Sequence, residues 1–92
     1  MTDVLQASDF AAGDRFNLGP EGEPFVLTVI AVQELPRAAR EGGAFRLELS
    51  GPVEPILAQA TYRFQGERRS DDIFIVPIGS DEHGTRYEAI FV

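Results

Sequence analysis

Short bursts of alternating apolar and polar residues, separated by glycine, proline and aspartate, constrain the fold of this chain more than any other feature. The clearest burst is AFRLELSG at residues 44–51, in which Phe45, Leu47 and Leu49 alternate with polar residues. Successive side chains of a β-strand point to opposite faces, so this pattern predicts a strand with one buried face. Strand-like segments also occur at residues 14–19, 25–35, 61–66, 72–79 and 84–92. The sequence therefore predicts an all-β domain of six strands.

Three of these segments depart from simple alternation. Residues 25–35 are apolar on both faces, so we expect this strand to be covered on both sides or to bend, each half burying a different face. Pro77 has no N–H to donate to a ladder, which predicts either a bulge or an outward-facing position. In the last segment Tyr87, Ala89 and Phe91 share the core side, and Ile90 indicates that the other face is covered too. We expect this last strand to be paired along its length.

Hairpin-length links between the segments predict an antiparallel meander that closes into a small barrel or rolls into a sandwich. The link at 51–60 contains two prolines and is expected to be extended, with Ile56 and Leu57 entering the core. A single helical turn is expected between Pro36 and Gly43.

A short helical turn is also expected before the first strand. Ser8 or Asp9 can cap it, and Gly13 can end it in the left-handed region. Leu5 and Phe10 would then seal one end of the core.

The composition limits the classes of function. The 92 residues fit one domain, residues 1–92, and the formal charge of −7 argues against binding to nucleic acid or to anionic membranes. The chain has no cysteine, and we find no signal peptide and no apolar stretch long enough to span a bilayer. We therefore expect a soluble cytoplasmic protein that binds neither nucleic acid nor a membrane.

No catalytic or metal-binding set stands out. Asp81, Glu82 and His83 lie together in one turn, and with Glu88 they offer metal ligands, but a solvated hairpin explains them better. None of the serines lies in a GxSxG elbow, and no glycine-rich phosphate loop is present. Asp71 and its neighbour would face opposite ways on a strand, which argues against paired catalytic carboxylates. We expect no catalytic residue, no cofactor and no metal, and so no enzyme.

Two further features have alternative interpretations. The loop sequence ERR at residues 67–69 can dock an acidic partner, or it can be a solvated loop tip. A set of aromatic residues can line a ligand cavity, although in so small a domain we expect them to fill the core. These residues are Phe45, Tyr62, Phe64, Phe74, Tyr87 and Phe91.

Four segments carry a family resemblance: SDFAAGDRFNL, FRLELSGP, LAQATYRF and IFIVPIGSDEHGTRYEAIFV. They resemble a family of small bacterial all-β proteins, a domain of unknown function whose sequences end in VPIGxxxxGxxYEAxF. Ala60 stands where the family commonly has glycine, and GERRSDD replaces a histidine-containing loop. The positions that mark the resemblance are Phe10, Gly13, Phe16, Tyr62, Pro77, Gly79, Gly84, Tyr87, Glu88 and Phe91.

The resemblance implies a companion of phage-tail-like genes. Together with the absence of a catalytic set, it leads us to expect a non-enzymatic structural or protein-interaction module. Such a module would bind a protein partner, or a second copy, through an exposed strand edge. The alternatives are an acidic inhibitor or immunity-type protein that binds a basic effector, and a β-barrel that carries a small ligand.

Overall fold

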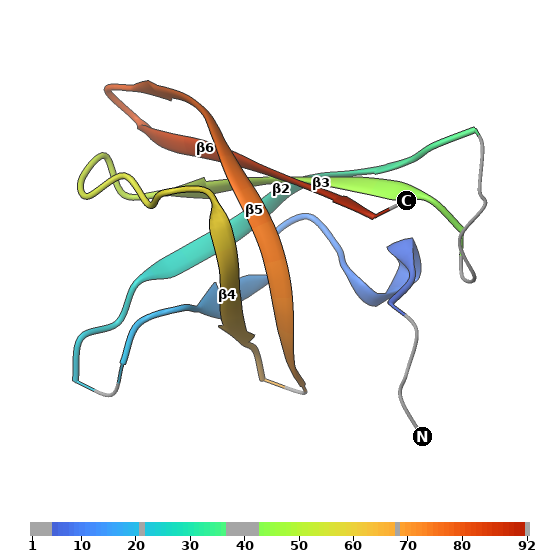
Figure 1. Ribbon diagram of the computed structural model, residues 1–92, viewed down its shortest axis with the longest axis horizontal. Coiled ribbons are helices and arrows are strands. Elements are labelled where there is room, and N and C mark those ends of the chain that lie inside the picture. Colours follow the sequence, from blue (N-terminus) through green and yellow to red (C-terminus); the bar gives the residue numbers. More distant parts are fainter. Residues whose placement is uncertain (1–4, 21, 37–42, 68, 92) are drawn as a thin grey trace.

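The computed structural model describes residues 5–20, 22–36, 43–67 and 69–91. Within them it confirms the all-β prediction, since one antiparallel sheet closes into a barrel and the helical content is a single 3-10 turn (Figure 1). The elements are η1 (Ala7–Asp9), β1 (Arg15–Asn17), β2 (Val26–Glu34), β3 (Phe45–Gly51), β4 (Ala60–Gln65), β5 (Ser70–Asp81) and β6 (Gly84–Phe91). The helical turn expected after Pro36 falls on residues 37–42, which lie outside the described residues.

The strand order around the barrel is β1-β2-β3-β6-β5-β4. The expectation of a meander is wrong, because β3 pairs with β6 and not with β4. Residues 52–59 lead from β3 to β4 past the two intervening strands, and a cis Glu54–Pro55 peptide bond lies in this link. Two prolines make the link extended and unlike a hairpin turn.

A β-bulge in β2 explains why this strand is apolar on both faces. Its register against β3 shifts between Val29 and Ala31, so that Ile30 is the extra residue. Before the bulge Val29 is buried, whereas after it Val32 packs against the core and Ile30 is exposed. Each half of the strand thus buries a different face, as the second alternative predicted.

The strand β5 contains a second bulge and is shared between two parts of the sheet. Its register against β6 shifts between Pro77 and Gly79, which confirms the predicted bulge at this proline. The half before the bulge, from Ser70 to Ile75, pairs with β4, while the half from Val76 onward pairs with β6. Bending of β5 between these two neighbours helps to close so small a barrel.

Aromatic rings fill the barrel and extend to one end of it. Phe45 stacks on Phe91 with ring centroids 4.3 Å apart, and Phe16 lies 5.6 Å from Phe64. Phe10, which follows η1, is within 6.2 Å of Phe91, so η1 and the end of β6 lie together (Figure 1). The buried apolar cluster comprises Phe10, Phe16, Leu27, Val29, Phe45, Leu47, Leu49, Phe64, Ile73, Ile75, Tyr87 and Ala89.

The N-terminal helical turn lies earlier in the chain than predicted. Ser8 and Asp9, the expected caps, are inside η1, which is capped by Gln6 and ends at Phe10 and not at Gly13. Asp9 lies at the third position of the turn, where its carboxylate accepts the backbone N–H of Gln6 at 2.8 Å. Gly13 has φ +98°, the left-handed conformation expected of it. Phe10 is buried and Leu5 packs against the core, so these two residues do seal one end.

Three apolar side chains lie outside the core, contrary to expectation. Phe74 is about half exposed, because its neighbours Ile73 and Ile75 occupy the inner face of β5. Ile90 is exposed to a similar degree, so the outer face of β6 is open at this position. In the link at 52–59 Leu57 packs against the core, whereas Ile56 points to solvent.

Candidate functional site

The barrel closes weakly between β1 and β4, and we call this junction the seam. The three residues of β1 all pair with β2, but only Asn17 pairs with β4, opposite Gln65. The chain leaves the sheet after Asn17, whose side-chain Oδ1 accepts the backbone N–H groups of Gly19 at 3.0 Å and Phe25 at 2.9 Å. These two hydrogen bonds fix the β1–β2 turn and end the pairing with β4.

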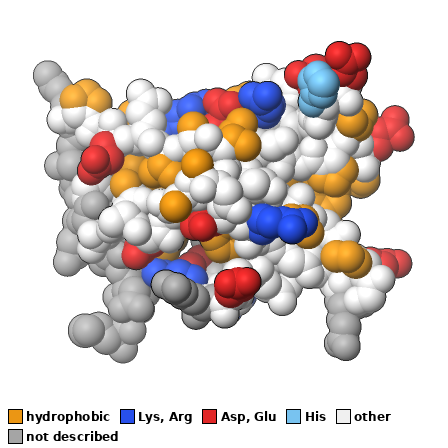
Figure 2. Space-filling model, turned by 180° about the vertical axis from the view of Figure 1, so that it is seen from behind, with side chains coloured by type: hydrophobic (Ala, Val, Ile, Leu, Met, Phe, Trp, Pro, Cys, Tyr) orange, Lys and Arg blue, Asp and Glu red, His pale blue; other side chains and the backbone are white. Residues whose placement is uncertain are grey.

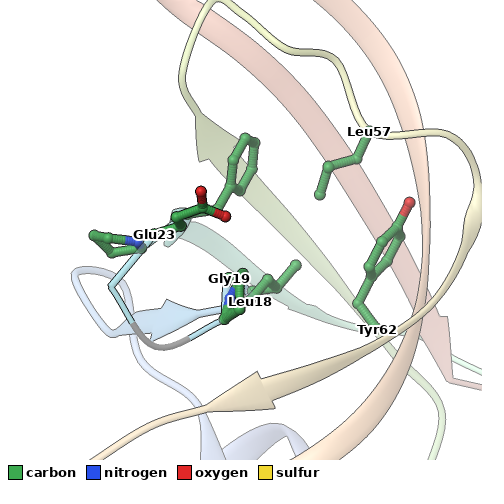
Figure 3. Close-up of a pocket in the computed structure, with 8 residues that line it drawn as sticks. Leu18, Gly19, Glu23, Leu57 and Tyr62 are labelled. Atoms are coloured by element: carbon green, nitrogen blue, oxygen red, sulfur yellow. The ribbon is translucent and has the colours of Figure 1, made fainter.

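An apolar hollow of about 390 Å³, which we call the seam pocket, opens beside this junction (Figure 3). The β1–β2 hairpin forms one side of it, and Leu57 and Tyr62 lie on the other side. The Tyr62 hydroxyl donates to the carbonyl of Ala58 at 2.7 Å, which holds the ring at the rim. The lining residues are Leu18, Gly19, Pro20, Glu23, Pro24, Phe25, Leu57 and Tyr62.

The seam pocket is supported from the core by Tyr87. This side chain is fully buried, and its hydroxyl accepts the backbone N–H of Leu57 at 2.9 Å. A buried tyrosine hydroxyl usually has a hydrogen-bond partner, and here the partner is the link that forms the pocket wall. A residue at the centre of β6 therefore positions a residue at the seam.

A larger and more polar hollow lies on the other side of the Asn17–Gln65 pair. It is bounded by the stretch before β1 and by the β4–β5 loop, and its volume is about 980 Å³. Arg69 spans it, at 2.8 Å from a carboxylate oxygen of Asp71 and 3.6 Å from one of Asp9. Arg69 thus binds two carboxylates of its own chain, a role that neither interpretation of the 67–69 loop predicted. Arg68 lies outside the described residues.

The turn at residues 81–83 does not gather metal ligands. The side chains of Glu82 and His83 are more than four-fifths exposed, and Glu88 is paired with Arg46. The pKa of Asp81 is lowered, chiefly because the backbone N–H of His83 donates to its carboxylate at 2.8 Å. Among the described residues no three His, Cys, Asp or Glu side chains form a group able to hold a metal ion.

Four charged side chains form a network on the outer face of β3 and β6, and we call it the charge quartet. Arg46 binds both Glu88 and Glu48, and Arg86 lies 3.1 Å from the second carboxylate oxygen of Glu48. Hydrogen bonding from Arg46 is the main cause of the lowered pKa of Glu48. Glu88, adjacent to Tyr87 in sequence, thus points away from it, as strand geometry predicts.

The residues that mark the family resemblance have mostly structural positions. Phe10, Phe16 and Tyr87 are buried, and Phe91 packs against them. Tyr62 is different, because it lines the seam pocket, and Glu88 belongs to the charge quartet.

The glycines and the proline in this set act through the backbone. Gly84 has φ +150°, and a Cβ atom there would lie 2.5 Å from the carbonyl oxygen of Gly51. Pro77 and Gly79 flank the bulge in β5, although a Cβ atom at Gly79 would meet nothing within 4 Å.

The seam pocket could not be predicted from the sequence. Its residues are dispersed over a turn, a link and a strand, and none of them carries a chemical motif. The one available signal was the spacing of glycine and proline at 19–24, which marks a turn whose backbone cannot pair with a neighbouring strand. Which strand lies beside that turn depends on the order of the strands around the barrel, and this order cannot be read from the local sequence pattern.

Comparison with known proteins identifies the family. No curated protein and no solved structure matches the chain. No helix in the described part of the chain is long and apolar enough to cross a membrane. Residues 5–91 match the family described as "Domain of unknown function (DUF6916)", which covers every strand of the barrel. The chain therefore belongs to the DUF6916 family.

Proposed function

We propose that this protein is a non-enzymatic interaction module that binds an extended segment of a partner protein at the seam. The observation that carries the proposal is the unpaired edge of β4 beside an apolar hollow. On the side away from β5, β4 pairs only at Gln65, and among the described residues no strand covers the edge from Ala60 to Phe64. The seam pocket opens next to this edge, since Tyr62 belongs to both.

An extended segment placed here would use both features. Its backbone would add to the free edge of β4 as a strand, and one of its apolar side chains would enter the pocket between Leu18 and Leu57. Main-chain hydrogen bonds supply affinity in this mode of recognition, and the pocket supplies specificity.

The charge of the molecule favours a basic segment. Among the described residues, Glu23 is the one ionisable residue, apart from Tyr62, that lines the seam pocket. The whole chain has a formal charge of −7. Complementary charge accelerates association more than it strengthens the final complex. The same charge supports a narrower form of the proposal, an inhibitor or immunity-type protein whose target is a basic effector. The family resemblance supports another, in which the partner belongs to a phage-tail-like assembly.

A second candidate function is the binding of a small apolar ligand. Its support is the volume of about 390 Å³, since small-molecule pockets span roughly 300 to 1,000 Å³. The interior of the barrel offers less support, because aromatic rings fill it. A small ligand would be held by the pocket walls alone and would not need the edge of β4.

The test is selection of binders from a library of random extended peptides, followed by NMR mapping on the full chain. We expect shifts at the β4 amides 60–64 together with the pocket residues, and weaker binding at higher salt. Leu57→Asp should abolish binding, whereas Ile56→Asp should leave it unchanged, because Ile56 is the exposed neighbour and does not line the pocket.

Two outcomes distinguish the alternatives. Shifts at the pocket walls without any at β4 favour the small ligand. Shifts confined to another face, or equal effects of the two substitutions, contradict a binding site at the seam.

A further inference from the structure

The charge quartet lies opposite the seam in the ring of strands. The strand order places the β3–β6 pair as far as possible from the β1–β4 pair. The quartet is held by seven consecutive residue pairs between β3 and β6, including Arg46 with Ile90 and Glu48 with Glu88. Figure 2 shows basic and acidic side chains side by side along one margin of the molecule, with hydrophobic side chains next to them.

Three exposed isoleucines surround the quartet. Ile90 is 52% exposed and lies directly across from Arg46 on the neighbouring strand. Ile30 and Ile78 are the extra residues of the two bulges, on the strands that flank β3 and β6, and they are 36% and 47% exposed. Single exposed isoleucines need no explanation, but three around one cluster form an apolar surface typical of an interface.

We propose that a second copy of this chain packs on this face in a two-fold symmetric dimer. The two arginines and two glutamates of the quartet cancel, so this face is locally neutral in a chain of formal charge −7. Two copies repel one another through the rest of their charge, and a neutral surface is where they can approach with the smallest repulsion. A strongly basic partner would gain no electrostatic attraction from this neutral face.

The pattern of charges also suits a symmetric contact. An isologous interface brings the same patch of both copies together, so the patch must be complementary to itself. In the quartet Glu48 and Glu88 lie directly opposite each other on β3 and β6, with Arg46 on one side of them and Arg86 on the other. A two-fold axis can therefore place an arginine of each copy against a glutamate of the other. Arg86 has the most accessible side chain of the four, at 43% exposed, and is placed to make such a contact.

Sedimentation velocity of the full chain over a micromolar to millimolar concentration series tests the proposal. We expect the 10.1 kDa monomer at low concentration to give way to a species of twice its mass. Ile90→Glu should weaken the dimer by about tenfold or more, as expected for a residue at the centre of an interface. Arg86→Glu should weaken it as well, because it makes the face negative.

Ile56→Glu is the matched control. Ile56 is 54% exposed, close to the value for Ile90, but it lies in the 52–59 link and not on β3 or β6, the strands that carry the quartet. The control adds the same charge and should leave the dimer unchanged, and circular dichroism should show both variants folded. A monomer at all concentrations, or equal weakening by Ile90→Glu and Ile56→Glu, would overturn the proposal. Peptide binding at the seam should survive Ile90→Glu, so the two proposals can fail separately.

Discussion

The two junctions on opposite sides of this barrel differ in almost every respect. The strands β3 and β6 pair over seven consecutive residues, with buried side chains beneath and an ion-pair network above. The strands β1 and β4 pair at one position, with a hollow on either side. Local stability in a protein follows buried contacts and protected hydrogen bonds, so the comparison separates a strongly paired part of the barrel from a weakly paired part.

The largest loss of stability is expected from a substitution in the strongly paired β3–β6 junction. Phe45 is fully buried and stacks on Phe91, so Phe45→Ala should lower the free energy of unfolding by about 3–5 kcal/mol. Urea unfolding followed by circular dichroism measures it. Leu18→Ala, at the partly buried rim of the seam, should lower the free energy of unfolding by clearly less than Phe45→Ala does. Equal losses for the two variants would show that the junctions do not differ in stability.

The second largest loss of stability is expected from a substitution at the seam, where β1 and β4 pair weakly. Asn17→Ala removes the acceptor of two backbone N–H groups, those of Gly19 and Phe25, and should cost about 1–3 kcal/mol. Native-state hydrogen exchange should accelerate around β1 and remain slow in β3 and β6. Asn17→Asp keeps an acceptor oxygen and serves as the control. Uniform acceleration over the whole barrel would contradict a separate, weaker seam.

A smaller loss of stability is expected when the hydrogen bond that joins Tyr87 of β6 to Leu57 at the seam is removed. Tyr87→Phe leaves the ring in place and deprives the N–H of Leu57 of its acceptor, so we expect a loss of about 1 kcal/mol. The amide of Leu57 should exchange faster with solvent, and peptide affinity at the seam should fall. Unchanged protection of this amide would mean that Tyr87 does not support the pocket wall.

The smallest effect concerns pH. Because Arg46 lowers the pKa of Glu48 in the folded protein, the pair stabilises the fold at neutral pH. That contribution is lost as pH falls below the ordinary glutamate pKa of about 4.3 and through the lower folded-state value. It should be less than about 1 kcal/mol, since the side chains are partly exposed. Glu48→Gln should flatten the acid dependence of the melting temperature; an identical profile would contradict the assignment.

Local pattern predicted the strands well because it depends on the side-chain alternation of each segment alone. It identified Phe45, Leu47 and Leu49 as an inner face, and for Pro77 it left two alternatives, of which the structure has the bulge. Local pattern gave wrong predictions for side chains whose exposure depends on whether another element of the fold covers them. Phe74 and Ile90 look like core residues in sequence, but no element of the described chain buries the part of the outer face on which they lie.

The sequence by itself determined the all-β class, the number of strands and the inward face of the last strand, because these depend on side-chain alternation. It limited Pro77 to a bulge or an outward-facing position, because proline has no N–H to donate. Only the tertiary structure decided that β6 lies between β3 and β5, and this choice creates both the charge quartet and the seam. The reason is physical. Residues 52–59 form an extended link that permits several strand orders, and the order is selected by how the apolar side chains of all strands pack in one interior.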